Sequence, residues 1–358
     1  MNQKIFIVIL LLGLLLSIFP AWSTSSDGMI QLFPIMSGTR WGYINRAGKV
    51  VIMPQFDGAD YFSEGLASIK QGAGSKARYG YINQTGKVVI TPRFNEVTSF
   101  SDGLAAVSVS KNQGVNTKWG YINKNGEWVI KPRFEEAGSF LNGLANVWLN
   151  ALKDEDELAC INKTGKIILS RRFPTAMEGY KEFAYINSKG VLDVEKKYLK
   201  AIKFSEGLAA VPTDEEYGRL GYIDMQGKVV IKPRYSDAKN FSERLAAVCV
   251  ESNKWGYIDK TGKMVIASRF SDAESFSNGL ALVTICPSDR GYSPPDDDIH
   301  MPYFAFIDKQ GRTIIKLYAE QAESFHNGLA RIWLSSRDAG GEPSYIDKTG
   351  KFVWKGKE

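Results

Sequence analysis

The sequence has few of the residues that most often perform chemistry. Its 358 residues include only two histidines, His300 and His326, and three cysteines. Two histidines cannot assemble a multi-histidine metal site, and neither lies in a motif that pairs it with a nucleophile. We therefore expect a protein that is not an enzyme, with no catalytic, metal-binding or cofactor-binding residues and no cofactor. His326 is expected to be a variable surface residue.

The three cysteines, Cys160, Cys249 and Cys286, allow at most one disulfide within the chain, and the sequence does not show whether any two of them pair. Cys160 stands where similar segments have tyrosine, and Cys249 lies in an apolar segment. Both are expected to be small, buried hydrophobic residues. A nucleophilic cysteine needs an activating base nearby, and no motif supplies one.

Long apolar runs are absent except at the start of the chain. After Lys4, an apolar run from Ile5 to Phe19 is followed by a small-residue segment that ends at Ser23. This pattern predicts a signal peptide over residues 1–23, cleaved after Ser23; an uncleaved signal anchor is the alternative. The run is shorter than the roughly twenty residues of a membrane-spanning helix. The mature chain is therefore expected to be secreted or periplasmic and to have no membrane span.

What the chain does contain is one segment repeated many times. Residues 41–70 read WGYINRAGKVVIMPQFDGADYFSEGLASIK, and closely similar segments begin at Tyr79 and Trp119. Tandem units of this kind predict an array in which neighbouring units share a core. The aromatic or equivalent position of the nine hairpin-like copies is occupied by Tyr43, Tyr81, Tyr121, Cys160, Tyr185, Tyr222, Tyr257, Phe306 and Tyr345.

Each copy has the features of a β-hairpin. Gly-Tyr-Ile and Val-Val-Ile are short runs of strand character on either side of an Asn/Asp-x-x-Gly link, as from Asn45 to Gly48. The Asn or Asp side chain can accept a backbone hydrogen bond within the turn, and the Gly can adopt a left-handed conformation. We interpret these Asn, Asp and Gly residues as turn residues.

A third strand is predicted from Gly-Leu-Ala-x-Val segments, for example at Leu104. Before it lies Pro-x-Phe-x-x-Ala-x-x-Phe, as from Pro132 to Phe140, which is expected to be a connecting loop that buries two aromatics. The fold class is then all-β: about nine three-stranded antiparallel meander units in a single domain, 24–358, with a degenerate first strand from Met29 to Phe33. The sequence leaves open whether the units form a propeller-like ring or an open β-solenoid-like array.

These motifs resemble the bacterial WG-repeat family. The resemblance rests on Lys-Trp-Gly-Tyr-Ile-Asp/Asn-Lys-x-Gly-Lys-x-Val-Ile-x-Pro-x-Phe and Phe-Ser-x-Gly-Leu-Ala, and it covers nearly the whole mature chain. Trp-Gly-Tyr-Ile is intact at Trp41, Trp119 and Trp255, whereas the other copies replace the Trp. The resemblance implies an exported β-repeat protein and no established activity, so no functional residue can be transferred to this sequence.

One segment, residues 286–303, interrupts the repeats. It reads CPSDRGYSPPDDDIHMPY and gathers Asp296, Asp297, Asp298 and His300. Long loops on a rigid scaffold often carry function. Three consecutive aspartates lack the alternating ligands of a calcium loop, so a solvated loop is the simpler interpretation and the role of the insertion stays open.

Two basic positions recur in the copies: a Lys after the turn glycine and an Arg before the aromatic of Pro-x-Phe. In register, they would form ladders able to bind an anionic polymer. The structural alternative is that Lys protects strand edges and that Arg covers aromatic faces. The lysines are Lys49, Lys87, Lys166, Lys228, Lys263 and Lys351, and the arginines are Arg93, Arg133, Arg172, Arg234 and Arg269.

Tryptophan offers a second possible recognition surface. Trp41, Trp119 and Trp255 recur at one strand position, which indicates core packing. Trp148 and Trp333, at the ends of Gly-Leu-Ala strands, are better candidates for exposed binding residues.

Many equivalent sites and no catalytic set favour an exported, non-catalytic scaffold that binds a protein or a cell-envelope glycan or other anionic polymer over an extended surface. A structural, self-associating envelope protein is the first alternative. The second is a carboxylate-dependent glycan hydrolase, which needs two facing carboxylates. The acids Glu64, Asp102, Glu206 and Glu243 instead recur with the repeat, as structural residues do. With 45 basic and 39 acidic residues, the charge is too balanced to predict a nucleic-acid partner.

Overall fold

The computed structural model describes residues 31–112, 115–141, 143–151, 155–174, 204–212, 219–224, 226–250, 254–286, 303–334 and 341–357. These residues form β-strands and one 3-10 turn, Gly74–Lys76, so the predicted all-β fold is confirmed. None of them forms a helix with the length and hydropathy of a membrane span. The predicted signal peptide, the hairpin around Tyr185 and residues 287–302 of the insertion lie outside the described residues.

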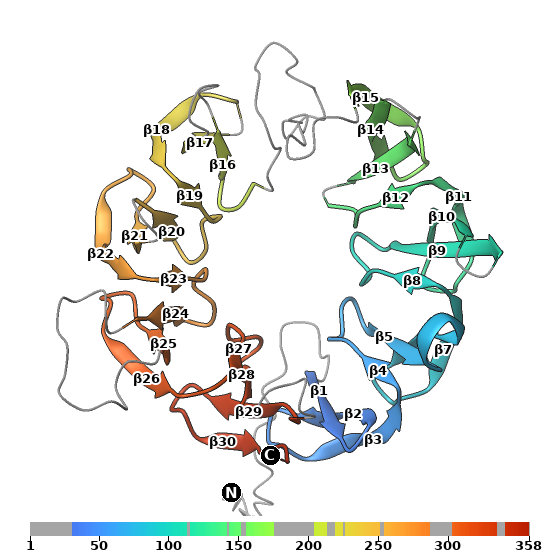
Figure 1. Cartoon of the computed structure of the whole chain (residues 1–358), viewed down its shortest axis with the longest axis horizontal. Coiled ribbons are helices and arrows are strands. Elements are labelled where there is room, and N and C mark those ends of the chain that lie inside the picture. The colour runs from blue at the N-terminus through green and yellow to red at the C-terminus, as the bar shows by residue number, and fades with distance from the viewer. Residues whose placement is uncertain are drawn as a thin grey trace, which may run out of the picture. The chain divides into compact units, whose positions relative to one another are not determined.

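Eight antiparallel sheets, numbered here as blades 1 to 8 in chain order, are arranged as a β-propeller (Figure 1). Blade 1 contains β1 (Leu32–Ser37), β2 (Arg40–Asn45) and β3 (Val50–Phe56); blade 2 contains β4 (Gly58–Ala59), β5 (Leu66–Gln71), β6 (Arg78–Asn83) and β7 (Val88–Phe94); blade 3 contains β8 (Glu96–Val97), β9 (Ala105–Asn112), β10 (Val115–Ile122) and β11 (Trp128–Phe134); blade 4 contains β12 (Glu136–Ala137), β13 (Leu144–Ala151), β14 (Glu155–Asn162) and β15 (Ile167–Pro174). Blade 5 contains β16 (Leu208–Pro212), β17 (Leu220–Asp224) and β18 (Val229–Tyr235); blade 6 contains β19 (Asp237–Ala238), β20 (Ala246–Cys249), β21 (Trp255–Ile258) and β22 (Met264–Phe270); blade 7 contains β23 (Asp272–Ala273), β24 (Ala281–Ile285), β25 (Tyr303–Ile307) and β26 (Thr313–Leu317); blade 8 contains β27 (Gln321–Ala322), β28 (Leu329–Trp333), β29 (Ser344–Asp347) and β30 (Phe352–Trp354).

The sequence repeat and the blade are out of phase, which corrects the predicted unit. A repeat runs from the Trp-Gly-Tyr-Ile hairpin to the following Gly-Leu-Ala strand, but the Gly-Leu-Ala strand pairs with the hairpin of the next repeat: β5 pairs with β6, and β6 with β7. Each repeat therefore connects two blades. The described structure has eight sheets in a propeller, rather than nine three-stranded meanders or an open solenoid.

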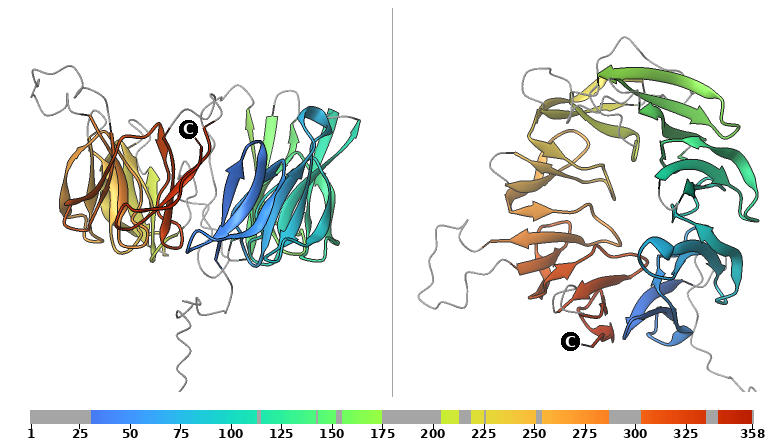
Figure 2. Two further views of the ribbon diagram at one scale, coloured as in Figure 1. Left: turned by 90° about the horizontal axis from the view of Figure 1, so that it is seen from below. Right: turned by 45° about the vertical axis from the view of Figure 1, so that its right-hand side comes forward.

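The segment predicted as a connecting loop also forms the innermost strand of most blades. In blade 4 it contains β12, which pairs with β13, and the aromatics on either side, Phe134 and Phe140, are buried as expected. These short strands lie toward the centre of the ring, and strands such as β3, β22, β26 and β30 lie at its outer rim (Figure 1). The edge-on view in Figure 2 shows the blades side by side, with their strands running between the two faces of the ring.

The hairpin turns follow the predicted chemistry. Asn45 Oδ1 accepts hydrogen bonds from the backbone N–H groups of Ala47 and Lys49, both at 3.0 Å, and Gly48 has a φ of +80°. The interpretation of the recurrent Asn, Asp and Gly as turn residues is confirmed.

The core lies between blades as much as within them. Tyr81, Ile90 and Phe94 of blade 2 cluster with Val107 and Ile122 of blade 3. The buried Tyr81 hydroxyl donates a hydrogen bond to the Thr98 carbonyl of blade 3, at 2.7 Å. One repeat cannot bury this apolar surface alone, which explains why the units stack.

The glycine of Trp-Gly is required by a bulge in the outermost strand. In blade 1, Trp41 lies opposite Phe56 whereas Tyr43 lies opposite Ile52, so the outer strand has extra residues beside Gly42. A Cβ on Gly42 would lie 2.4 Å from the carbonyl oxygen of Ile52. The same shift occurs in the other blades that keep this glycine, namely at Gly80, Gly120, Gly221 and Gly256.

Blades 4 and 7 have Ala159 and Ala305 at this position, and there the register is continuous. The paired residues Leu158 and Arg171, Ala159 and Ser170, and Phe304 and Leu317 follow without interruption. The bulge beside this position therefore occurs only where the inner residue has no Cβ, whereas the register shift next to the hairpin turn also occurs in blades 4 and 7.

Candidate binding surface

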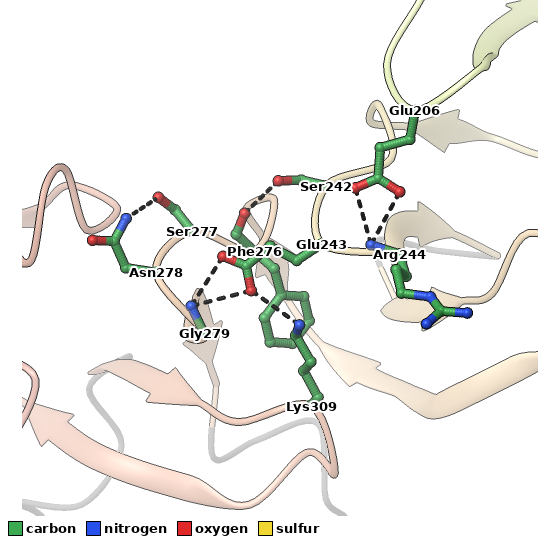
Figure 3. Close-up of polar contacts among 9 residues, drawn as sticks. All are labelled: Glu206, Ser242, Glu243, Arg244, Phe276, Ser277, Asn278, Gly279 and Lys309. Carbon is green, nitrogen blue, oxygen red and sulfur yellow. Dashed lines mark hydrogen bonds and ion pairs between the residues drawn. The ribbon is translucent and has the colours of Figure 1, made fainter. Parts of the chain in front are cut away.

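The four recurrent acids lie in the turn that precedes each Gly-Leu-Ala strand, and each contacts the next blade. Glu243 of blade 6 accepts a hydrogen bond from Gly279 N of blade 7 at 3.0 Å (Figure 3). Asp102 accepts one from Gly143 N at 2.6 Å. The backbone of the acids is left-handed, with φ between 51° and 54°. We call these turns the latch turns.

A lysine from the next blade completes most of these contacts. Lys124, Lys260 and Lys309 lie 3.1 Å from carboxylate oxygens of Glu64, Glu206 and Glu243, respectively. Partial burial disfavours the charge of Glu206, but hydrogen bonds from the Lys260 ammonium and the Arg244 backbone outweigh it and hold the pKa of Glu206 below its ordinary value. These contacts support a structural role for the recurrent acids.

The latch turns are also joined by their serines. Ser242 Oγ donates to the carbonyl oxygen of Phe276 in the next blade at 2.6 Å (Figure 3), and Ser101 Oγ does the same to Phe140. Further pairs of this kind are Ser63 with Phe100, Ser205 with Phe241 and Ser277 with Phe325.

The recurrent arginines form a second set of contacts between blades. Arg93 lies over the ring of Phe94, 5.0 Å from its centroid, and its guanidinium donates to the carbonyl oxygen of Gly126 in blade 3 at 2.7 Å. Arg133, Arg234 and Arg269 make the equivalent two contacts. The prediction that these arginines cover aromatic faces is confirmed, and the side chain of Arg172 lies outside the description.

The outer rim carries a repeated apolar feature that the sequence analysis missed. The second residue of the Val-Val-Ile strand faces solvent in seven of the eight blades, with between 40% and 48% of its surface exposed. Exposed apolar surface of this kind is a candidate interaction feature, since exposed apolar patches often mark binding sites. We call these residues the outer belt: Val51, Val89, Val129, Ile168, Val230, Val265 and Ile314.

Basic residues accompany the outer belt. The six recurrent lysines lie between the turn glycine and the first residue of the outer strand, and all are exposed: Lys49, Lys87, Lys166, Lys228, Lys263 and Lys351. The sequence contained a signal for the outer belt. A half-buried strand needs an apolar residue only at every second position, but Val-Val-Ile also has an apolar residue next to the buried Ile, on the side that faces away from the core.

A non-repeating cluster joins blade 8 to Tyr61, which lies between β4 and β5. Arg331 on β28 donates to both carboxylate oxygens of Glu323, at 3.0 and 2.6 Å, and its guanidinium lies 5.0 Å from the ring centroid of Tyr61. The Tyr61 hydroxyl donates to Glu323 at 3.3 Å, and burial raises the pKa of Tyr61 to about 12. The signal for this cluster was a departure from the repeat, since the other Gly-Leu-Ala segments have an uncharged residue, such as Ala106 or Leu282, at the position of Arg331.

The remaining predicted residues have ordinary surroundings. Cys160 and Cys249 are buried as expected, and burial raises the pKa of the Cys160 thiol to about 11; both, like Cys286, are free thiols. His326 is exposed and stacks on Tyr61 with a centroid distance of 4.8 Å.

The tryptophan predictions need correction. Trp333 is only 2% exposed, so its proposal as an exposed binding residue is wrong, and Trp148 is half-buried. Arg331 lies over the Trp333 ring and helps to cover it. Of the tryptophans expected in the core, Trp255 is buried, whereas Trp41 and Trp119 are half-buried against it.

Metal binding has no support in the described part of the chain, where no three His, Cys, Asp or Glu side chains lie close enough to hold an ion. The aspartates and His300 of the insertion lie outside it.

In the described part of the chain, the fold is an eight-bladed β-propeller in which latch turns join blades 2 to 4 and blades 5 to 8. The family model described as WG containing repeat matches residues 41–73, 79–112, 119–150, 221–254, 255–285 and 304–332. These segments make up more than half of the chain, and the chain belongs to this family. Each match starts in one blade and ends in the next, as the repeat itself does.

Solved structures show likeness in fold alone. A crystal structure of a eukaryotic initiation factor has 11% identity and a TM-score of 0.51, covering 92% of this chain and 98% of that one. Prolyl oligopeptidase B from Galerina marginata, bound to a 35mer hydrolysis and macrocyclization substrate, has 11% identity and a TM-score of 0.50, covering 85% of this chain and 51% of that one. The chain thus spans about half of the oligopeptidase. No curated protein sequence matches the chain.

Proposed function

We propose that the chain is an exported, non-catalytic scaffold that binds another protein through its outer rim. The outer belt carries this proposal, because it repeats an exposed aliphatic side chain on a ring whose blades are joined by hydrogen bonds. Such a rim offers many equivalent contacts that need little ordering on binding, which favours affinity. Export rests on the apolar segment before Ser23.

The recurrent acids support the non-catalytic part of the proposal. A glycan hydrolase needs one carboxylate free to exchange a proton and a second that faces it. The carboxylates of Glu64, Glu206 and Glu243 are instead occupied by a lysine and a backbone N–H of the next blade. Turnover of a labelled glycan by the purified chain would contradict the proposal.

The experiment is capture of partners from envelope fractions by residues 24–358, followed by mass spectrometry. A belt variant, Val89→Thr/Val129→Thr/Val230→Thr, keeps the branched side-chain shape but adds hydroxyls, and it is expected to lose the partner. The control, Lys87→Gln/Lys166→Gln/Lys228→Gln, is expected to keep it. Loss in the control alone would instead indicate an anionic polymer bound by charge.

A further inference from the structure

The outer strand of each blade is the edge of its sheet, and most blades protect this edge. An unprotected edge exposes backbone N–H and C=O groups that can pair with another chain; bulges and prolines prevent such pairing. β3, β7, β11, β18 and β22 all have the bulge described above. Four of them also contain a proline, which lacks a backbone N–H: Pro54, Pro92, Pro132 and Pro233.

Two blades lack both the bulge beside the glycine and an internal proline, and their one register shift lies next to the hairpin turn, between Phe306 and Ile307 in blade 7 and between Cys160 and Ile161 in blade 4. β26 in blade 7 contains no proline and pairs continuously with β25 from Phe304 to Phe306, because Ala305 replaces the glycine. β15 in blade 4 is equally continuous, and its one proline, Pro174, is its last residue. No strand in the described part of the chain pairs with the free side of either one. β30 is also without proline, but it has only three residues.

The side chains around β26 define what could pair with it. Ile314 is 48% exposed and Tyr318, directly after the strand, is 66% exposed. The Lys316 ammonium lies 4.2 Å from the ring centroid of Tyr303 and 4.8 Å from that of Tyr318. The Arg312 side chain, 74% exposed, precedes the strand and forms an ion pair with Asp308 at 2.7 Å. The edge therefore combines apolar, aromatic and cationic groups.

We propose that β26 accepts an extended, acidic segment of a partner protein as an added strand, which rests on the proposed function and identifies where and how the partner binds. The backbone of β26 supplies the hydrogen bonds, Ile314 and Tyr318 contact apolar side chains, and Lys316 and Arg312 attract carboxylates. A second copy of this chain is a poorer occupant, because two β26 strands would bring these cations together.

The test is binding of a fluorescent, capped peptide of alternating valine and glutamate to residues 24–358, measured by anisotropy. The variant Ala305→Gly/Leu317→Pro gives blade 7 the glycine and proline of the protected blades, and it is expected to weaken binding at least about tenfold. Its melting temperature shows whether the blade stays folded. An equal affinity in a folded variant would overturn the proposal.

Two charge-reversal variants test the proposal even if Ala305→Gly/Leu317→Pro unfolds. Lys316→Glu is expected to weaken binding of the acidic peptide about threefold and to favour a valine–lysine peptide, as expected for an exposed charge. The matched control is Lys232→Glu, at the same position of the protected strand β18, which is expected to change neither affinity. Equal effects of the two substitutions would show that the peptide responds to overall charge, and would overturn the proposal.

Two further outcomes separate this inference from the proposed function. If the captured partner still binds Ala305→Gly/Leu317→Pro but not the belt variant, strand addition at β26 is wrong and the scaffold function stands. If sedimentation shows that the wild-type chain dimerises and that this variant is monomeric, the edge pairs with a second copy and the partner-segment proposal is wrong.

Discussion

The regular junctions between blades and the junction between blades 8 and 1 are built differently. At a regular junction, the latch turn of one blade bonds the latch turn of the next through a serine hydroxyl and a carboxylate, as Ser242 and Glu243 do. At the junction of blades 8 and 1, His326 and Asn327 occupy the positions of that serine and acid. There the contacts come from residues that do not recur, such as the hydrogen bond from Gly38 N to Glu342 and the packing of Arg331 over the Tyr61 ring.

The closing contacts reach far along the chain. The Tyr345 hydroxyl donates to the Pro34 carbonyl on β1 at 2.8 Å, and Gly38 N donates to Glu342 at 2.6 Å. Phe33 and Tyr345 pack in one apolar cluster. A repeated sequence gives the same contacts at successive junctions between blades. The two ends of the array meet at one junction only, so the contacts there come from residues that do not recur.

The largest expected effect is from breaking the non-repeating cluster. Arg331→Ala removes two charge-assisted hydrogen bonds of a side chain that is only 14% exposed, and should lower the free energy of unfolding by about 2 to 3 kcal/mol. Denaturant unfolding measures the change. Arg312→Ala, which removes an exposed ion pair with Asp308, is the control and should cost no more than about 0.5 kcal/mol. Equal losses of stability in the two variants would show that the Arg331 cluster contributes no more than an exposed ion pair.

Tyr345 and Tyr81 donate equivalent hydrogen bonds from their hydroxyl groups, so their Phe variants form a matched pair of substitutions. Tyr345→Phe and Tyr81→Phe each remove one hydrogen bond to a carbonyl of the neighbouring blade and should each cost about 1 to 1.5 kcal/mol. Hydrogen exchange distinguishes them: only Tyr345→Phe should speed exchange of the β1 amides, because only Tyr345 holds Pro34. Faster β1 exchange in Tyr81→Phe as well would mean that the ring opens as one unit.

A smaller effect is expected at a single regular latch. Ser101→Ala removes the hydrogen bond to Phe140 and should cost about 1 kcal/mol in thermal or denaturant unfolding. His326→Ser places the repeat residue at the closing junction and should change stability by less than about 0.5 kcal/mol, as most surface substitutions do. A stabilisation comparable with the loss in Ser101→Ala would show that a regular latch can form there.

The smallest expected effect is on the stability of the folded chain at acidic pH. The pKa of Glu206 is lowered in the folded chain, so its contribution to stability is present above its unfolded pKa and is lost as the pH falls through the folded pKa. Melting temperatures from pH 7 to pH 3 should therefore fall less steeply below pH 4.5 in Glu206→Gln than in the wild type. Parallel curves would exclude a contribution of this latch carboxylate to acid unfolding.

Much of the local structure was predictable because it depends on neighbours in sequence. The turn from Asn45 to Gly48, the burial of Phe134 and Phe140, and the covering of Phe94 by Arg93 all follow from one repeat or from adjacent residues. The candidate surface was harder to predict, since exposure of Val89 depends on what the neighbouring blade covers. Trp333 failed as an exposed residue because the repeat pattern does not predict that the non-repeating Arg331 lies over its ring.

The sequence by itself determined the strands, the hairpin turns and membership in a tandem β-repeat family, because period, turn residues and strand propensity are local properties. It also contained the glycine-to-alanine exchanges at Ala159 and Ala305. Only the tertiary structure showed that Gly-Leu-Ala strands pair with the next hairpin, that the array closes through Tyr345 and Pro34, and that β26 pairs without the glycine bulge from Phe304 to Phe306. These features depend on pairing between distant segments, and several pairings are compatible with the same local pattern.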